Sequence, residues 1–159
     1  MLNAKDILTE QLLANATESN WYASFQLAVK GLEEKEAFWK PNEKCHNIAE
    51  IVQHLIFWNA TWQKRYIHAD VKAVALVTNN KDTFIVPEGK EFFQLKGELL
   101  ELLLAWKELF TEEQLESEVK GTTEPGKWGE VIAHAITHNA YHIGQIVYIR
   151  KMQQAFRGV

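Results

Sequence analysis

Apolar residues recur at helical intervals in four long stretches of the chain, and polar connections separate these stretches. Apolar positions at i, i+3, i+4 and i+7 are typical of amphipathic helices that bury one face. The pattern predicts four helices, over residues 4–29, 48–67, 91–110 and 129–151. Gly31 is expected to stop the first helix, and Asn47 with Glu50 forms a capping box before the second.

Residues 69–90 are the least regular part of the chain. The stretch VKAVALV is compatible with a helical extension or a short strand, whereas NNKD and PEG are turn signals. We expect this segment to be a loop. Four long helices with one long crossover predict an all-α four-helix bundle. No repeat, low-complexity stretch or linker interrupts the pattern, which predicts a single domain over residues 1–159.

The composition excludes several classes of partner and setting. Of the 159 residues 47% are hydrophobic, enough for a sizeable core, and the formal charge of -4 comes without a run of Lys or Arg. We therefore expect neither nucleic acid nor an anionic membrane as a partner. The single cysteine, Cys45, and an N-terminus without a signal-peptide pattern predict a cytoplasmic location. Residues 131–149 carry no charge, but their histidines and amides suit a helix buried in protein, not in lipid.

Three histidines follow one another at one-turn intervals in the last predicted helix, at His134, His138 and His142. Two imidazoles at i and i+4 can hold one metal ion, but the outer two lie roughly 12 Å apart, so three in a row cannot. The third ligand must come from elsewhere. His54, on the inward face of the second helix beside Ile51, is the natural candidate. Three histidine ligands leave a position for water or substrate, which favours catalysis.

Simpler interpretations exist for each histidine. A lone inward histidine such as His54 is more often a hydrogen-bonded core residue than a ligand. His46 and His68 stand in polar contexts near the ends of the second helix, where we expect a solvated surface. Spacing alone also leaves His134 and His138 as a rival ligand pair.

Two stretches resemble the DinB-like superfamily, which includes YfiT-like metal-dependent enzymes, and the resemblance covers nearly the whole chain. They are FWKPNEKCHNIAEIVQHLIFWNATW and WGEVIAHAITHNAYHIGQIVYIRK. The resemblance implies a DinB/YfiT-like four-helix bundle whose metal is held by one histidine of the second helix and two from an HxxxH in the last. Those positions fall on His54, His138 and His142. A secondary role is left for His134.

Helix geometry suggests which groups could orient these ligands. Glu50 precedes His54 by about one turn, Gln145 follows His142 by about one turn, and His134 precedes His138. For Glu50 a capping residue that faces solvent is the simpler interpretation. Imidazole ligands suit zinc or nickel well.

Members of the resembled superfamily include thiol-dependent S-transferases and isomerases, and proteins regarded as hydrolases. Our first hypothesis is therefore an enzyme of the thiol S-transferase type, with a low-molecular-weight thiol as co-substrate and a small-molecule substrate. A metal-dependent hydrolase is the alternative, weakened because no acidic residue stands beside the histidines as in HExxH sites. A non-catalytic metal-binding domain represents a different class.

The aromatic segments WYASF and IFWNATW carry more apolar area than one core stripe accommodates. We expect another copy to cover part of it, and the resemblance also implies a homodimer. In the alternative, the loop over residues 69–90 folds over this surface. Gly144, which is costly inside a helix, indicates a place where another helix packs closely.

Overall fold

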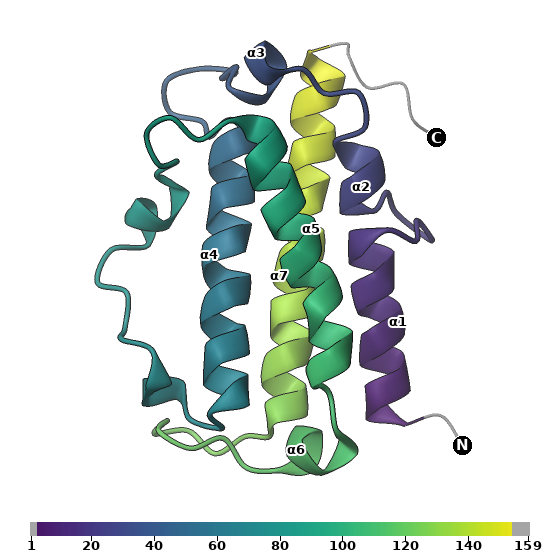
Figure 1. The fold of residues 1–159 in the computed structure, drawn as a ribbon, viewed down its shortest axis with the longest axis vertical. Coiled ribbons are helices and arrows are strands. Elements are labelled where there is room, and N and C mark those ends of the chain that lie inside the picture. Colours follow the sequence, from purple (N-terminus) through teal and green to yellow (C-terminus); the bar gives the residue numbers. More distant parts are fainter. Residues whose placement is uncertain (1–2, 154–159) are drawn as a thin grey trace.

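Four long helices run side by side along the molecule in the computed structural model, which describes residues 3–153 (Figure 1). They are α1 (Ala4–Ala16), α4 (Ile48–Ile67), α5 (Phe92–Leu109) and α7 (Trp128–Met152). Three short helices, α2 (Phe25–Ala28), α3 (Glu34–Ala37) and α6 (Glu112–Glu116), and two 3-10 turns, η1 (Val71–Ala73) and η2 (Asn80–Phe84), lie in the connections. Each long helix packs against two of the others, which closes the bundle. The all-α prediction is confirmed.

The second predicted helix agrees with α4 at both ends, because its start is encoded locally. The side chain of Asn47 accepts a hydrogen bond from the backbone N–H of Glu50 at 2.8 Å, and the Glu50 carboxylate accepts one from the backbone N–H of Asn47 at 3.0 Å. This reciprocal capping box satisfies two of the amide groups that a helix start leaves unpaired. It also places His54 two turns into the helix.

The first predicted helix is wrong in its second half, because α1 ends at Ala16 and α2 is a separate turn. The backbone N–H groups of Thr17 and Glu18 both donate to the carbonyl of Leu13 and terminate the helix. The hydroxyl of Ser19 then accepts a hydrogen bond from the backbone N–H of Ser24, which holds the loop between the two helices. Short hydroxyl side chains compete in this way with helical hydrogen bonds.

A long crossover joins α4 to α5, and it lies at the left of the bundle in Figure 1. Its turns η1 and η2 both pack against α4. The connection brings the chain back to the level where α4 began, so α4 and α5 run in the same direction while α1 and α7 run in the other. VKAVALV contains the turn η1 and no strand. The predicted loop is thus a packed segment that covers one side of α4.

Two clusters of buried apolar side chains form the core, one around Leu55 and Leu99 and the other around Trp106 and Trp128. Buried polar side chains of α4 and α7 lie beside these clusters, including two of the histidines described below. Among the described residues no helix has the length and apolarity that crossing a membrane requires.

Candidate metal centre

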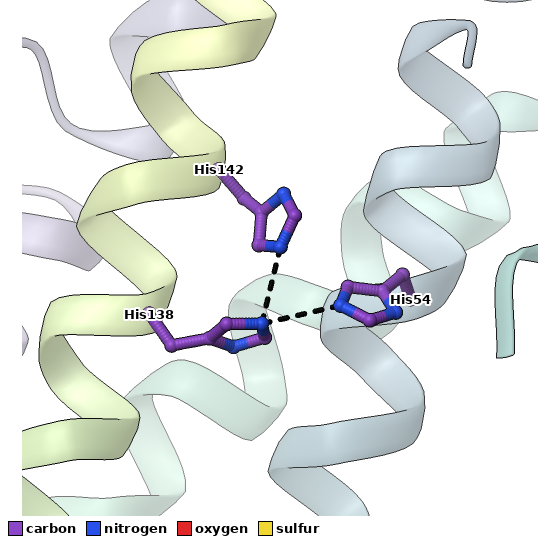
Figure 2. Close-up of side chains that lie close together, drawn as sticks. All are labelled: His54, His138 and His142. Atoms are coloured by element: carbon purple, nitrogen blue, oxygen red, sulfur yellow. Dashed lines mark hydrogen bonds between the residues drawn. The ribbon is translucent and has the colours of Figure 1, made fainter. Parts of the chain in front are cut away.

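His54 of α4 and His138 and His142 of α7 point toward one another across the helix interface (Figure 2). The Nε2 atom of His138 lies 3.2 Å from Nε2 of His54 and 3.1 Å from Nε2 of His142. One ring nitrogen from each of the three residues lies within 4.8 Å of the others. Helix α7 brings two imidazoles to one place through its i, i+4 spacing, and α4 supplies the third from the facing helix.

Thr83 in the turn η2 determines which nitrogen of His54 carries hydrogen. Its hydroxyl donates to the carbonyl oxygen of Asn80 at 2.7 Å, so the same oxygen accepts at 2.6 Å from Nδ1 of His54. The hydrogen of a neutral His54 is therefore on Nδ1. The lone pair of Nε2 is directed into the cluster.

Gln145 has the same effect on His142. Its side-chain oxygen lies 2.7 Å from Nδ1 of His142, and an amide oxygen can only accept, so Nδ1 donates. The lone pair of Nε2 again faces the cluster. The sequence suggested Gln145 as an orienting residue, and the structure places it in contact with His142.

The spacing of the three nitrogens fits a small divalent ion. Tetrahedral zinc with Zn–N bonds of about 2.0–2.1 Å would separate its nitrogen ligands by roughly 3.3 Å. The separations of 3.1 and 3.2 Å at His138 are close to that value. His138 has one hydrogen at most to share with two inward lone pairs, those of His54 and His142, so the cluster is short of donors. A cation bound between the three nitrogens would satisfy all of them.

Burial keeps these imidazoles in the neutral form that binds metal. The side chains of His54 and His142 are only 2% and 7% exposed. Burial, together with smaller contributions from the neighbouring His142, His138 and His46, lowers the pKa of His54 to about 3. Burial lowers the pKa of His142 to about 4, against the hydrogen bond to Gln145, and also lowers the pKa of His138. No proton needs to leave these rings before they coordinate at neutral pH.

An aromatic stack covers His54 on the side of the crossover. The ring of Phe84 lies parallel to His54 with centroids 3.9 Å apart, and its other face stacks on His46 at the same distance. Phe84 thus stands between the two histidines. His46 and His68 are both exposed as expected, and one face of the His46 ring is covered by Phe84.

Two other residues that the sequence singled out lie outside the cluster. His134 is exposed and is not among the three histidines that converge. Glu50 is used in the capping box, in an ion pair of 2.7 Å with Lys40 and in a contact of 3.3 Å with His46. It therefore acts as a cap at the helix start, and its carboxylate is held by partners other than His54.

Thr83 and Phe84 were missed in the sequence. They lie in an irregular segment whose path depends on how the whole crossover packs against α4. A threonine and a phenylalanine beside a turn signal carry no pattern that points to a histidine 29 residues away.

Comparisons with known proteins agree with the fold. The sequence profile that describes the DinB superfamily matches residues 11–146, a range that includes all three histidines. The crystal structure of YjoA, a DinB-like protein from Bacillus subtilis, is similar with a TM-score of 0.65 and 19% sequence identity, covering 92% of each chain. At that identity the likeness shows the fold alone. No curated protein matches this chain.

Proposed function

The chain belongs to the DinB superfamily, and from this premise we propose that it binds one divalent metal ion and acts as a thiol S-transferase on a small molecule. The ligands are His54, His138 and His142, and the ion is zinc or nickel, which imidazole nitrogens suit. The observation that supports this most directly is the convergence of three Nε2 atoms from two helices. A low-molecular-weight thiol is the co-substrate.

The side chains around the cluster have definite tasks in this proposal. Thr83 and Gln145 hold the hydrogens of two imidazoles on the outer nitrogens, so that the inner ones are free to coordinate. Three protein ligands leave room for an external ligand. A divalent ion in this site would lower the pKa of a thiol or a water molecule bound to it.

The surroundings favour transfer over hydrolysis. No Asp or Glu of residues 3–153 belongs to the cluster, so a carboxylate that could assist hydrolysis as a general base is missing there. A thiolate is itself the nucleophile. Its sulfur forms a bond to an electrophilic carbon of the substrate, the leaving group departs with its bonding pair, and the thiol proton passes to solvent.

Elemental analysis of histidine variants tests the metal site. In protein purified without chelator or affinity nickel, His54→Ala, His138→Ala and His142→Ala should each lower bound metal by more than about tenfold, since even losing a partner of a ligand costs about 10–100-fold. His134→Ala is the control and should retain the metal. If His134→Ala removes the metal and His142→Ala does not, the ligand pair is His134 with His138.

A thiol-conjugation assay tests the reaction. Metal-loaded protein should accelerate loss of a free thiol such as cysteine in the presence of a neutral electrophile such as 1-chloro-2,4-dinitrobenzene. Chelated protein should not. Turnover of esters without thiol consumption would favour the hydrolase, and tight metal binding without either activity would identify a non-catalytic binder.

A further inference from the structure

A cavity of about 410 Å³ lies between α4 and α7 and ends at His138. Trp58 and Trp62 form its wall on the side of α4, and Val131 and Ala135 form its wall on the side of α7. The volume is that of a pocket for a small organic molecule.

This cavity gives access to the histidine cluster. His138 is partly exposed, whereas His54 and His142 are almost fully buried. Four further cavities in the described part of the chain are lined by none of the three histidines. A molecule that reaches the cluster through the cavity beside the two tryptophans meets His138 first.

The cavity walls carry no Lys, Arg, Asp or Glu side chain. Most polar groups of the wall already form hydrogen bonds within the protein. Asn59 and Asn139 exchange hydrogen bonds of 2.8 and 3.2 Å, and the indole N–H of Trp58 points to Asn80 at 3.3 Å. A charged ligand would lose its hydration here without gaining a counter-charge.

His134 supplies a polar group that is still free at this cavity. It lies one turn before His138 on α7 and forms no hydrogen bond with any residue between 3 and 153. Its exposed imidazole can donate or accept one hydrogen bond. The indoles of Trp58 and Trp62 line the cavity beside it, and the guanidinium of Arg65 lies 4.7 Å over the ring of Trp62. The remaining indole surface suits a planar ring.

We propose that this cavity binds the substrate of the three-histidine site, and that the substrate is a neutral, planar, mainly apolar compound with one polar atom hydrogen-bonded to His134. The assignment of the occupant as substrate rests on the function proposed above. Binding itself depends only on the cavity. It can therefore be measured separately from metal content and turnover.

Calorimetric titration with matched ring compounds tests the chemical class. The probes are 2-naphthol and naphthalene-2-sulfonate, added to the full chain as purified and again after chelation. We expect 2-naphthol to bind at least about tenfold more tightly than the sulfonate in both states, because the cavity offers no counter-charge. Equal or tighter binding of the sulfonate would overturn the proposal.

Filling the cavity tests the location. Ala135→Leu and the larger Ala135→Phe should weaken 2-naphthol binding by at least about tenfold, because each side chain occupies ligand space. Thr137→Leu and Thr137→Phe place the same groups on the exposed face of α7 and should leave binding unchanged. If Ala135→Phe fails to fold, the smaller leucine still decides the matter. Unchanged binding in a folded Ala135 variant would place the ligand elsewhere.

The role of His134 is tested with a second pair of probes. His134→Ala should weaken the binding of 2-naphthol about two- to tenfold, the value of one net hydrogen bond, and should not affect naphthalene, which lacks the hydroxyl. Equal effects on both would refute the hydrogen bond. If the wild-type protein binds 2-naphthol but lacks bound metal or thiol turnover, the proposed function is refuted and the cavity assignment stands. If the wild-type protein is active but does not bind 2-naphthol, the cavity assignment is refuted and the proposed function stands.

Discussion

At the scale of single residues, the state of the metal ligands depends on two neutral hydrogen-bond partners. Thr83 and Gln145 each accept a hydrogen from the outer nitrogen of a histidine, at 2.6 and 2.7 Å. Carboxylates often occupy this position beside metal-bound histidines, and they increase the basicity of the ring. A hydroxyl and an amide orient the ring without adding negative charge. Thr83 therefore fixes the orientation of the His54 ring and has little effect on its basicity.

Replacing Thr83 tests this control. Thr83→Val keeps the shape of the side chain but removes the acceptor, so Nδ1 of His54 is left buried without a partner and the other tautomer becomes competitive. We expect metal affinity to fall by about 10–100-fold, measured by competition with a chelator of known affinity.

Two variants control for this effect. Thr83→Ser retains the hydroxyl and should retain affinity, and Thr78→Val makes the same change at an exposed site of the crossover. Wild-type affinity in Thr83→Val would mean that stacking on Phe84 is sufficient to orient His54.

At the scale of elements, a pair of buried amides sets the register of α4 against α7. Asn59 donates to Asn139 at 2.8 Å and accepts from it at 3.2 Å, and the indole N–H of Trp106 donates to the same oxygen of Asn59 at 2.9 Å. Asn139 adjoins His138, and Asn59 follows His54 by five residues. Sliding one helix along the other would break these bonds and separate the histidines as well.

Asn139→Leu should therefore weaken both stability and metal binding. The substitution leaves one N–H of the Asn59 amide without its acceptor in the core, while the Asn59 oxygen keeps the indole N–H of Trp106, and an unpaired buried donor costs about 1–3 kcal/mol. Urea unfolding of the metal-free protein measures this loss. Thr137→Leu, on the exposed face of the same helix, is the matched control and should lie within about 0.5 kcal/mol of wild type. A stable Asn139→Leu variant with full metal affinity would show that apolar packing alone sets the register.

Local signals explain which elements the sequence predicted well. The capping box of Asn47 and Glu50 starts α4 within a few residues, and helical periodicity places α5 and α7 within a residue or two of their observed ends. The i, i+4 spacing of His138 and His142 and the inward position of His54 are also local. Their grouping could therefore be predicted once the helices were known to face each other.

The features that the sequence did not predict depend on side-chain contacts that leave no periodic pattern in the chain. Apolar positions keep their helical spacing through Trp21 and Phe25, but the chain between α1 and α2 is not helical. Hydrogen bonds of the Ser19 hydroxyl to Ser24 hold it as a loop. Competition between side chain and backbone is not visible in periodicity. Thr83 reaches His54 only because the crossover folds back along α4. No pattern within the crossover specifies that path.

At the scale of the whole molecule, the buried histidines make the metal-free fold sensitive to acid. The pKa values of His54 and His142 in the fold are about 3 and about 4, below the ordinary value of 6.5. Between these limits the unfolded chain binds protons that the folded chain does not. The free energy of unfolding therefore rises with pH over this window. The stability that the neutral histidines contribute is lost as the pH falls from about 6.5 toward about 4.

Urea unfolding at several pH values measures this dependence. The denaturation midpoint of metal-free wild type should fall steadily between about pH 7 and about pH 4.5. His54→Gln removes one of these buried histidines and should show a shallower decline over the same range. Carboxylates titrate equally in both proteins, so they cancel in the comparison. Parallel curves would mean that His54 does not hold a depressed pKa.

The outer surface bears on the question of a second copy. Of the two aromatic segments that exceeded one core stripe, the one on α4 is partly covered, since Ile56 is buried and Trp58 bonds to Asn80 of the crossover. The crossover therefore contacts this segment through Trp58. Trp21, however, is 96% exposed. It lines a hollow together with Gly144 of α7. Apart from the neighbouring residues of α7 itself, no described atom lies within 4 Å of the point that a Cβ at Gly144 would occupy. The helix that Gly144 was expected to meet therefore does not come from residues 3–153.

We propose that a second copy of the chain meets the face formed by Trp21 and Gly144, because a fully exposed indole beside an open helix surface is costly in water and suited to contact. Sedimentation equilibrium at micromolar concentration should find a dimer. Trp21→Ser should shift it to monomer without changing metal content. Leu76→Ser provides the matched control, because Leu76 is also a largely exposed apolar residue, 84% exposed, but lies on the crossover at α4. A wild-type monomer throughout the range, or a dimer that Leu76→Ser dissociates and Trp21→Ser does not, would remove this face as the interface.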